Sequence, residues 1–293
     1  MGIWTALWTP TDETGALLKE PLKRHLDFLL NNGVTGIAVA GSTGQFTYLD
    51  VATRKELLHL VCQHVGPERV FVNISDIRPQ NVAELALHAK EEKVRAIMLL
   101  PPMYYAFFQA DIASYFIHMA KIAARPLVLY NYPECVRNRI ELETLEVVAK
   151  EVPLVGIKQS GLDFAYHTPL INLGKKIGFQ VFTGAENKLQ EALNLGVSGN
   201  IGGLSNAIPE LVVGVFSGFK AQDMALAEAK MRKIREIDSL LKPVCFPLTV
   251  AALMEAKGLT PGSHKEILSG STKMAYKQLV NTLRECINKQ DSE

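Results

Sequence analysis

The segment EPLKRHLDFLLNNGVTGIAVAG, residues 20–41, combines a helical pattern, a turn and a strand pattern. Its leucines recur at i, i+4, i+7 and i+8, which places one apolar face along a helix: Leu22, Leu26, Leu29 and Leu30. Asn32-Gly33 supplies the turn chemistry with which helices end, and the apolar run GIAVAG begins at Gly36. The segment therefore predicts a helix that leads directly into a buried strand.

The same strand pattern recurs along the chain. Consecutive helical crossovers would make the strands parallel, and near-continuous apolar strands fit a sheet that is covered on both faces. Eight short apolar runs begin 20 to 34 residues apart, the interval that one strand, one helix and two loops occupy: 3–9, 36–41, 70–75, 96–101, 126–131, 154–159, 179–184 and 199–204.

An eightfold alternation of strand and helix closes most naturally into a barrel. An open doubly wound sheet would favour a GxGxxG fingerprint after the first strand, but TPTDETG stands there, at residues 9–15. We therefore predict an α/β fold, a (β/α)8 TIM barrel that carries the active site, over residues 1–220. A C-terminal helical extension is predicted over 221–293, from helical patterns in 221–241, 242–258 and 264–286. We expect it to cover one side of the barrel or to join a subunit interface.

Composition excludes several classes of function. The 31 basic and 30 acidic side chains give a net charge of +1 with no basic stripe, so we expect no nucleic-acid partner. No basic amphipathic helix, no apolar stretch of ~18 residues and no signal peptide pattern are present, so we expect no membrane association. The cysteines are far apart and lack zinc spacing, which predicts reduced thiols, a cytoplasmic protein and no metal: Cys62, Cys135, Cys245 and Cys286.

A lone lysine ends the predicted sixth strand, in VPLVGIKQSG at residues 152–161. Catalytic groups of such barrels stand at the carboxyl ends of the strands. Burial disfavours the charged form of an amine, and a neutral amine can attack a ketone to form a Schiff base. Lys158 is therefore a candidate nucleophile. The position of Lys158 in the sequence equally allows a structural lysine, whose methylene groups pack on the barrel wall and whose ammonium group reaches water.

Two further stretches stand at strand ends. Tyr130 ends the fifth strand, beside the sixth, and a phenol there can move protons for Lys158, although a lone tyrosine is more often a core residue with a satisfied hydroxyl. Gly41-Ser42-Thr43-Gly44 offers hydroxyls and backbone N–H groups that suit a carboxylate. Such turns are commonly structural. The segment Gly199–Gly203 could likewise be either a tight packing corner or a phosphate-binding loop.

Taken in order along nearly the whole chain, these stretches resemble the dihydrodipicolinate synthase/N-acetylneuraminate lyase family of class I pyruvate-dependent aldolases. Each motif alone is weak, whereas all of them in sequence at barrel spacing are specific. The matching motifs are Thr9-Pro10, Gly41-Ser42-Thr43-Gly44-Gln45, Tyr130-Asn131-Tyr132-Pro133, Gly156-Ile157-Lys158, Gly184 with Glu186, and Ile201 with Asn206.

The resemblance implies pyruvate bound as an imine on Lys158, with Tyr130 as the proton shuttle and no metal or other cofactor. It also implies a homotetramer, in which Tyr104 reaches into a neighbouring subunit's site; Tyr104 aligns better than Tyr105. The substrate-binding residues would be the carboxylate-binding loop and the lining of the pocket beyond it: Ser42, Thr43, Gly44, Ser160, Glu186, Asn187, Ile201 and Gly203.

The chain departs from the family pattern where subfamilies differ. Dihydrodipicolinate synthases carry an arginine where Cys135 stands, and a thiol cannot form the bidentate pair that an arginine gives a carboxylate. Arg137 and Arg139 could substitute only with a shifted loop. Gln45 replaces a usual glutamate. Sialic-acid lyases have a glutamate at the place of Asn187 and a hydroxyl at that of Gly203, so sialic acid is not favoured.

Tyr130–Pro133 resembles 2-keto-3-deoxygluconate aldolases, whereas the loop at Gly41 and Lys158-Gln159-Ser160 resemble 4-hydroxy-2-oxoglutarate aldolases. The resemblance therefore implies a lyase that cleaves a 4-hydroxy-2-oxo acid of either type to pyruvate and an aldehyde. The alternative is 4-hydroxy-tetrahydrodipicolinate (dihydrodipicolinate) synthase, condensing pyruvate with aspartate semialdehyde. A catalytically silent sensor of pyruvate or a sugar acid is a third hypothesis. In each case the partners are small molecules.

Overall fold

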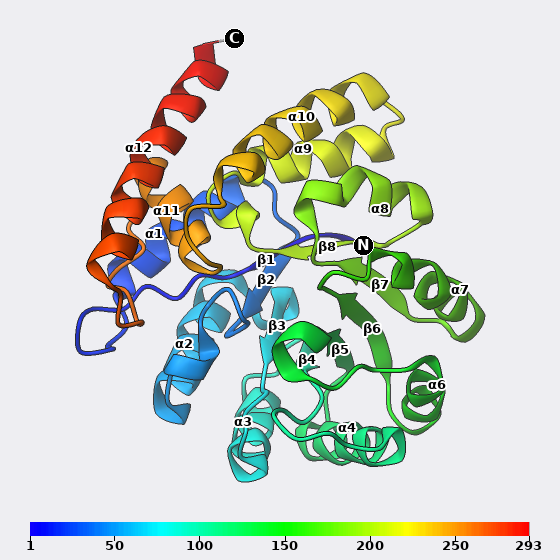
Figure 1. Cartoon of the computed structure of the whole chain (residues 1–293). Coiled ribbons are helices and arrows are strands. Elements are labelled where there is room, and N and C mark those ends of the chain that lie inside the picture. Colours follow the sequence, from blue (N-terminus) through cyan, green and yellow to red (C-terminus); the bar gives the residue numbers. More distant parts are fainter. Residues whose placement is uncertain (293) are drawn as a thin grey trace.

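The computed structural model describes residues 1–292, with side chains placed through Lys289. Its centre is a closed parallel barrel in which each strand pairs with the next and β8 pairs with β1 (Figure 1). The predicted (β/α)8 barrel is confirmed. The strands are β1 (Gly2–Ala6), β2 (Gly36–Val39), β3 (Val70–Asn73), β4 (Ala96–Leu99), β5 (Leu127–Asn131), β6 (Leu154–Gln159), β7 (Gln180–Thr183) and β8 (Gly199–Gly202).

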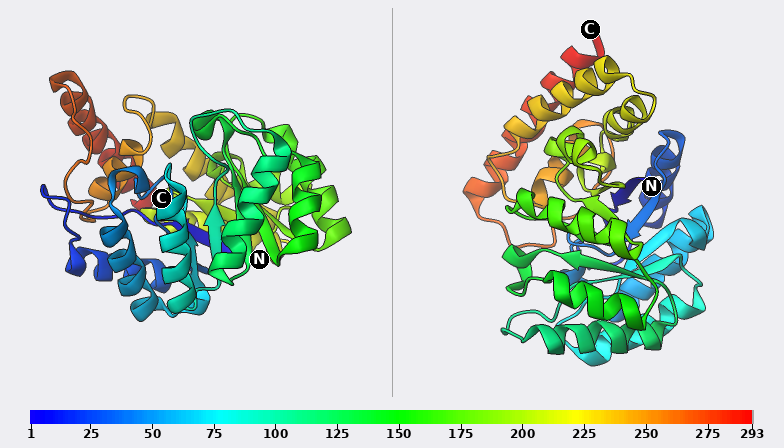
Figure 2. Two further views of the ribbon diagram at one scale, coloured as in Figure 1. Left: turned by 90° about the horizontal axis from the view of Figure 1, so that it is seen from below. Right: turned by 90° about the vertical axis from the view of Figure 1, so that its right-hand side faces the viewer.

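Helices surround the strands in chain order, as two further views show (Figure 2). They bury one face against the barrel; α1, for example, buries the predicted leucine face with Leu22, Leu26 and Leu29. The helices are α1 (Lys19–Asn31), α2 (Val51–Val65), α3 (Pro79–Glu91), α4 (Gln109–Ala123), α5 (Pro133–Val136), α6 (Leu142–Glu151), α7 (His167–Ile177), α8 (Leu189–Leu195) and α9 (Pro209–Lys220).

Aromatic rings fill part of the barrel interior. The Trp4 ring on β1 stacks on Phe71 of β3, with centroids 3.7 Å apart. Phe71 also meets the edge of Phe182 on β7, at 6.3 Å. These strands are not neighbours, so the rings meet across the interior, and Gly36 of β2 leaves room for Trp4 because a Cβ there would lie 2.4 Å from the indole. The barrel is therefore a packed core whose functional groups lie at its rim.

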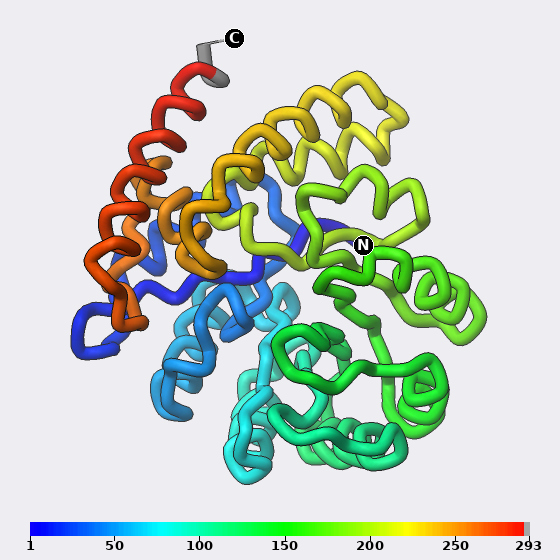
Figure 3. The backbone as a smooth tube through the Cα atoms, viewed as in Figure 1, coloured from blue at the N-terminus to red at the C-terminus, as the bar shows by residue number. Residues whose placement is uncertain are grey.

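The predicted helical extension is present as α10 (Met224–Leu240), α11 (Leu248–Ala256) and α12 (Gly270–Ser292). The chain path shows α10 running back along α9 before the chain crosses to α11 and α12 (Figure 3). One hydrophobic core includes Val212 of α9, Ile234 of α10 and Leu253 of α11. The division into domains 1–220 and 221–293 therefore stays a prediction.

Two observations bear on the predictions from composition. Among the described residues, none of the four cysteines forms a disulfide. Within residues 1–292, no helix has the length and apolar character needed to cross a bilayer.

Candidate active site

Lys158 and Tyr130 stand side by side at the rim of the barrel. The parallel register of β5 and β6 pairs them directly. The Lys158 side chain is buried, with 6% of the residue exposed, and its Nζ lies 4.1 Å from the centroid of the Tyr130 ring. The amine therefore lies against the Tyr130 ring and is shielded from bulk solvent, where it could act as a nucleophile with the phenol close by.

The loop after β2 reaches the same point. The Ser42 hydroxyl lies 3.3 Å from the hydroxyl of Tyr130, within hydrogen-bond distance. A Cβ on Gly44 would stand 2.7 Å from the backbone oxygen of Leu7, so only glycine lets this loop approach β1 so closely. Ser42 can thus exchange a proton with the Tyr130 hydroxyl, and Lys158 lies against the ring of the same tyrosine.

Gln45 turns away from these groups. It adopts a left-handed backbone conformation with φ of 58°, and its amide contacts Glu266 and accepts a hydrogen bond of 3.2 Å from the Lys265 Nζ. Burial lowers the pKa of Lys265 to about 8, against the opposing charge of Glu266. The residue that replaces the family glutamate therefore fastens the loop to the segment between α11 and α12.

A cavity of about 400 Å³ opens above Lys158. Ser42, Gly44 and Tyr104 are absent from its lining in this chain, although Ser42 contacts Tyr130 behind it. Most of the predicted site residues do line it: Thr43, Tyr130, Lys158, Ser160, Glu186, Asn187, Ile201 and Gly203.

The outer wall of this cavity is formed by residues that the sequence patterns did not predict. The extension was expected to cover the barrel or join an interface, yet α10, α11 and the segment between them line the cavity directly. The loops after β5 to β7 and the end of β8 add lining residues that were not among the predicted site residues: Tyr132, Gly161, Leu162, Gly184, Ala185, Gly202 and Leu204. The wall residues from the extension are Asp238, Leu241, Phe246, Thr249 and Val250.

Glu186 is held at the carboxyl end of β7 by backbone donors. Its oxygens accept hydrogen bonds from the N–H groups of Leu204, at 2.8 Å, and Ser205, at 3.1 Å. A Cβ on Gly202 would lie 2.2 Å from the Glu186 carboxyl carbon, so strand β8 needs glycine there. Burial raises the pKa of Glu186 to about 7, although the backbone N–H groups and the charge of Lys158 oppose this shift.

This shift predicts a pH-dependent contribution to stability. Between about pH 4.5, the ordinary pKa, and about pH 7, folded Glu186 keeps a proton that the unfolded chain releases. The folded state binds more protons in this window, so stability falls as pH rises through it and levels off above it, by on the order of 3 kcal/mol for this group. Thermal unfolding of wild type and Glu186→Gln should show the wild type losing more stability than the variant over this range. Parallel pH profiles would contradict the prediction.

Two other glycines allow close contacts in the site. A Cβ on Gly184 would lie 2.1 Å from the Ser160 Oγ and 3.2 Å from the Lys158 Cε. One on Gly203 would lie 3.1 Å from the Thr43 Oγ1. A side chain with a hydroxyl at position 203, as expected of sialic-acid lyases, would therefore crowd Thr43 in the loop after β2.

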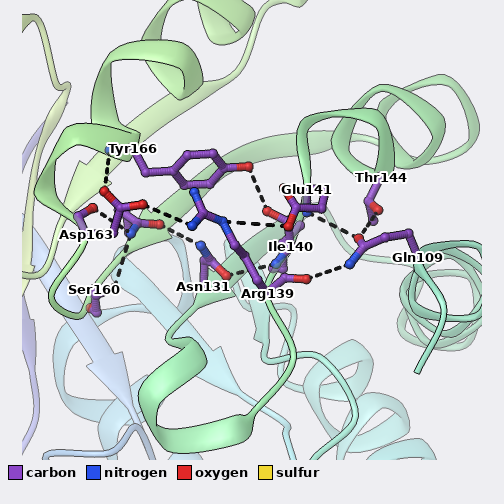
Figure 4. Close-up of polar contacts among 10 residues, drawn as sticks. Gln109, Asn131, Arg139, Ile140, Glu141, Thr144, Ser160, Asp163 and Tyr166 are labelled. Atoms are coloured by element: carbon purple, nitrogen blue, oxygen red, sulfur yellow. Dashed lines mark hydrogen bonds and ion pairs between the residues drawn. The ribbon is translucent and has the colours of Figure 1, made fainter. Parts of the chain in front are cut away.

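Arg139 cannot take the place of the arginine that synthases use, because its guanidinium is already engaged. It lies 3.7 Å above the Tyr166 ring and bonds Asp163 at 3.0 Å (Figure 4). Neither Arg137, Arg139 nor Cys135 belongs to the cavity lining. The shifted loop that would bring an arginine to the site is absent from this structure.

The same network fixes the ends of β5 and β6. The Asn131 amide donates to Gln159 Oε1 at 2.7 Å, and its oxygen accepts from the Ile140 N–H at 3.0 Å (Figure 4). Both amides are buried. Because Asn131 follows Tyr130 and Gln159 follows Lys158, this pair holds the two candidate catalytic residues in register.

Tyr104 lies on the surface of its own chain. It has a left-handed backbone, φ 78°, and is 68% exposed. Its ring meets Tyr105 edge-on at 4.9 Å, and Phe107 and Phe108 of the same segment are also exposed. Within residues 1–289, no group of three or more histidine, cysteine or acidic side chains could hold a metal ion.

A (β/α)8 barrel with a buried lysine beside a tyrosine at its rim fits the class of lysine-dependent aldolases. The model of the dihydrodipicolinate synthetase family matches residues 1–286, and the chain belongs to this family. It is accordingly a carbon–carbon lyase of the class I aldolase type.

The relatives of this chain are named for more than one activity. The chain is 27% identical over 230 residues to a probable 2-dehydro-3-deoxy-D-pentonate aldolase of Escherichia coli K12, covering 77% of this chain and 76% of that protein. It is 26% identical over 286 residues to a 4-hydroxy-tetrahydrodipicolinate synthase of Methanococcoides burtonii, covering 97% of each. These identities alone do not separate the two activities.

Solved structures agree with the fold. A prophage protein of the dihydrodipicolinic acid synthase family from E. coli K12, in complex with pyruvate, superposes with a TM-score of 0.88 at 23% identity, over 97% of this chain and 98% of that one. A sialic acid aldolase of Ruminococcus gnavus gives 0.86 at 23%, over 98% of each chain.

Proposed function

We propose that the protein is a Schiff-base-forming aldolase that reversibly cleaves 4-hydroxy-2-oxo acids to pyruvate and an aldehyde. The observation that carries this proposal is the buried Lys158 amine, 4.1 Å from the centroid of the Tyr130 ring at the carboxyl end of β6. A primary amine in that place can form an imine with a 2-oxo group. The protonated imine accepts the electrons of the bond that breaks.

Lys158 and Tyr130 carry the steps that form the imine and break the C3–C4 bond. Lys158 Nζ, as a neutral amine, attacks C2 of the substrate. Tyr130 then gives its proton to the hydroxyl that leaves as water, which yields the protonated imine and a phenolate. Tyr130 takes the proton of the 4-hydroxyl, the electrons of the C3–C4 bond flow into the imine, and the aldehyde leaves. The resulting enamine is protonated at C3, and water releases pyruvate from Lys158. Ser42, 3.3 Å from the Tyr130 hydroxyl, is placed to pass the proton on.

The substrate carboxylate would lie against the loop after β2. Ser42, Thr43 and Gly44 offer two hydroxyls and backbone N–H groups there. Ser160, Glu186, Asn187, Ile201 and Gly203 line the space left for the rest of the substrate. These steps use side chains alone, so we propose that the reaction needs no metal or other cofactor.

The cavity lining disfavours the synthase alternative. Aspartate semialdehyde carries a carboxylate that needs a cationic partner. Among residues 1–289, Lys158 is the one lysine or arginine that lines the cavity, and it is used for the imine. The third hypothesis, a silent sensor, is supported only by the irregular motif at Cys135, and the presence of both the amine and the phenol argues against it.

A substrate panel tests the proposal. The purified protein would be assayed with 2-keto-3-deoxy sugar acids, with 4-hydroxy-2-oxoglutarate, and with pyruvate plus aspartate semialdehyde. We expect release of pyruvate from one or more of the 4-hydroxy-2-oxo acids. Turnover of aspartate semialdehyde alone would replace the proposal with the synthase, and ligand-dependent thermal stabilisation without any turnover would replace it with the sensor.

We also propose that the protein is a homotetramer in which Tyr104 completes a neighbouring subunit's site. The exposed aromatic segment formed by Tyr104, Tyr105, Phe107 and Phe108 supports this, because exposed apolar patches commonly mark interfaces. Phe108→Asp, which places a charge on the patch, should lower both the mass seen by light scattering and the activity. Tyr104→Phe should keep the mass and lower activity. A wild type that is an active monomer would contradict the proposal.

A further inference from the structure

The outer wall of the cavity carries one carboxylate that the proposed mechanism does not use. Asp238, on α10, lines the cavity, and its Oδ2 accepts a 2.9 Å hydrogen bond from the Asn187 amide. Asn187 belongs to the segment after β7 and follows Glu186 in the sequence. The contact therefore joins the barrel rim to the extension and fixes the orientation of both side chains.

The two carboxylates that line the cavity differ in how many of their oxygens already accept hydrogen bonds. Both oxygens of Glu186 accept backbone hydrogen bonds. The second oxygen of Asp238, Oδ1, forms no hydrogen bond within residues 1–289. The amide of Asn187 is turned so that its nitrogen meets Asp238, which leaves its own oxygen free as an acceptor. The outer wall thus presents acceptors to a bound molecule.

The position of Asp238 is electrostatically unfavourable for the isolated helix. It lies in the last turn of α10, which ends at Leu240 and has no basic residue in that turn. The carboxyl end of a helix carries partial negative charge, so an anion there costs stability. The carboxylate of Asp238 therefore stands where the helix end already carries partial negative charge, and it is the one acidic side chain among the wall residues from the extension.

We propose that Asp238, positioned by Asn187, is a specificity-determining residue that selects substrates with an uncharged, hydroxylated tail and rejects those with a second carboxylate. The inference rests on the proposed function. Lys158 fixes the 2-oxo end, so the remaining carbons of a longer substrate extend into the rest of the cavity. A hydroxyl can donate to the free oxygen of Asp238, whereas a carboxylate has no proton to donate and is repelled.

The test compares two substrate types. For wild type we expect kcat/KM for 2-keto-3-deoxygluconate, whose tail is neutral, to exceed that for 4-hydroxy-2-oxoglutarate by about 100-fold or more, since like charges brought together in a site cost several kcal/mol. Asp238→Asn keeps the shape and can still accept from Asn187, and it should lower this ratio about 10-fold or more. Most of this change should come from a higher kcat/KM for 4-hydroxy-2-oxoglutarate, the dicarboxylate.

Two controls separate charge from structure. Glu228→Gln removes one charge from the same helix at a residue that pairs with Arg235, 3.6 Å away, outside the cavity lining, and should leave the ratio unchanged. If Asp238→Asn does not fold, wild type alone gives the answer. Added salt should lower the KM for 4-hydroxy-2-oxoglutarate relative to that for the neutral substrate, because screening weakens the repulsion.

The outcomes distinguish this inference from the proposed function. Failure of wild type to trap pyruvate with borohydride would overturn the aldolase proposal itself. Trapping and cleavage with a wild type that prefers the dicarboxylate, or with an Asp238→Asn ratio equal to that of wild type, would overturn the role of Asp238 and leave the aldolase standing.

Discussion

Lys158→Ala will neither cleave a 4-hydroxy-2-oxo acid nor retain pyruvate after borohydride treatment. The loss in kcat should be about 10⁴-fold or more, since removal of a covalent nucleophile from other enzymes has effects of this size. In wild type, the amine and pyruvate lose water to form an imine, and borohydride adds hydride to its carbon. Peptide mass spectrometry should place the resulting secondary amine on the peptide that contains Lys158.

Lys188→Ala is the matched control. Lys188 follows the same rim, with its Nζ 5.0 Å from the centroid of the Phe164 ring, but it is exposed and does not line the cavity. This variant should keep both cleavage and the adduct. An adduct on another lysine in Lys158→Ala would show that Lys158 is not the nucleophile. A folded wild type that forms no adduct would contradict the Schiff-base mechanism.

The barrel was predictable because parallel strands buried on both faces leave an apolar signature that helices interrupt at regular intervals. The predicted strand 154–159 agrees with β6. Other strands are shorter than their apolar runs: β1 ends at Ala6, although the pattern extends to Thr9. The apolar character of Leu7 and Trp8 reflects burial outside the sheet, which hydrophobicity alone cannot distinguish from pairing in it.

The site was predictable to the extent that it follows the strand ends. Lys158 and Tyr130 are neighbours because β5 and β6 are consecutive in a parallel barrel, and strand order follows from chain order there. Asp238 was missed because it comes from α10, after the last strand, and no barrel rule relates that helix to the rim. One signal was present: an acidic residue in the last turn of a helix that has no basic residue in that turn.

Tyr130→Phe should lower kcat for cleavage by about 10² to 10⁴-fold, the range for loss of a general acid–base group. The ring remains, so the packing of Lys158 against it should persist, and KM should change little. Pyruvate should still be trapped on Lys158 by borohydride, although more slowly. A core tyrosine with a purely structural hydroxyl would instead lower the melting temperature and leave kcat of the folded protein nearly unchanged.

Tyr132→Phe provides the comparison, because the two phenol rings lie nearly parallel with centroids 6.0 Å apart and both line the cavity. Burial raises the pKa of the Tyr132 hydroxyl above its ordinary value, and the Cys135 side chain adds to the shift. Tyr132 therefore holds its proton more tightly and is poorly suited to exchange it. The two tyrosines also differ in position. Tyr130 pairs with Lys158 across β5 and β6 and contacts Ser42, whereas Tyr132 lies beyond the end of β5. Loss of the Tyr132 hydroxyl should thus lower kcat by less than about tenfold, the cost of one hydrogen bond. Equal losses in the two variants would mean that neither phenol alone moves the proton.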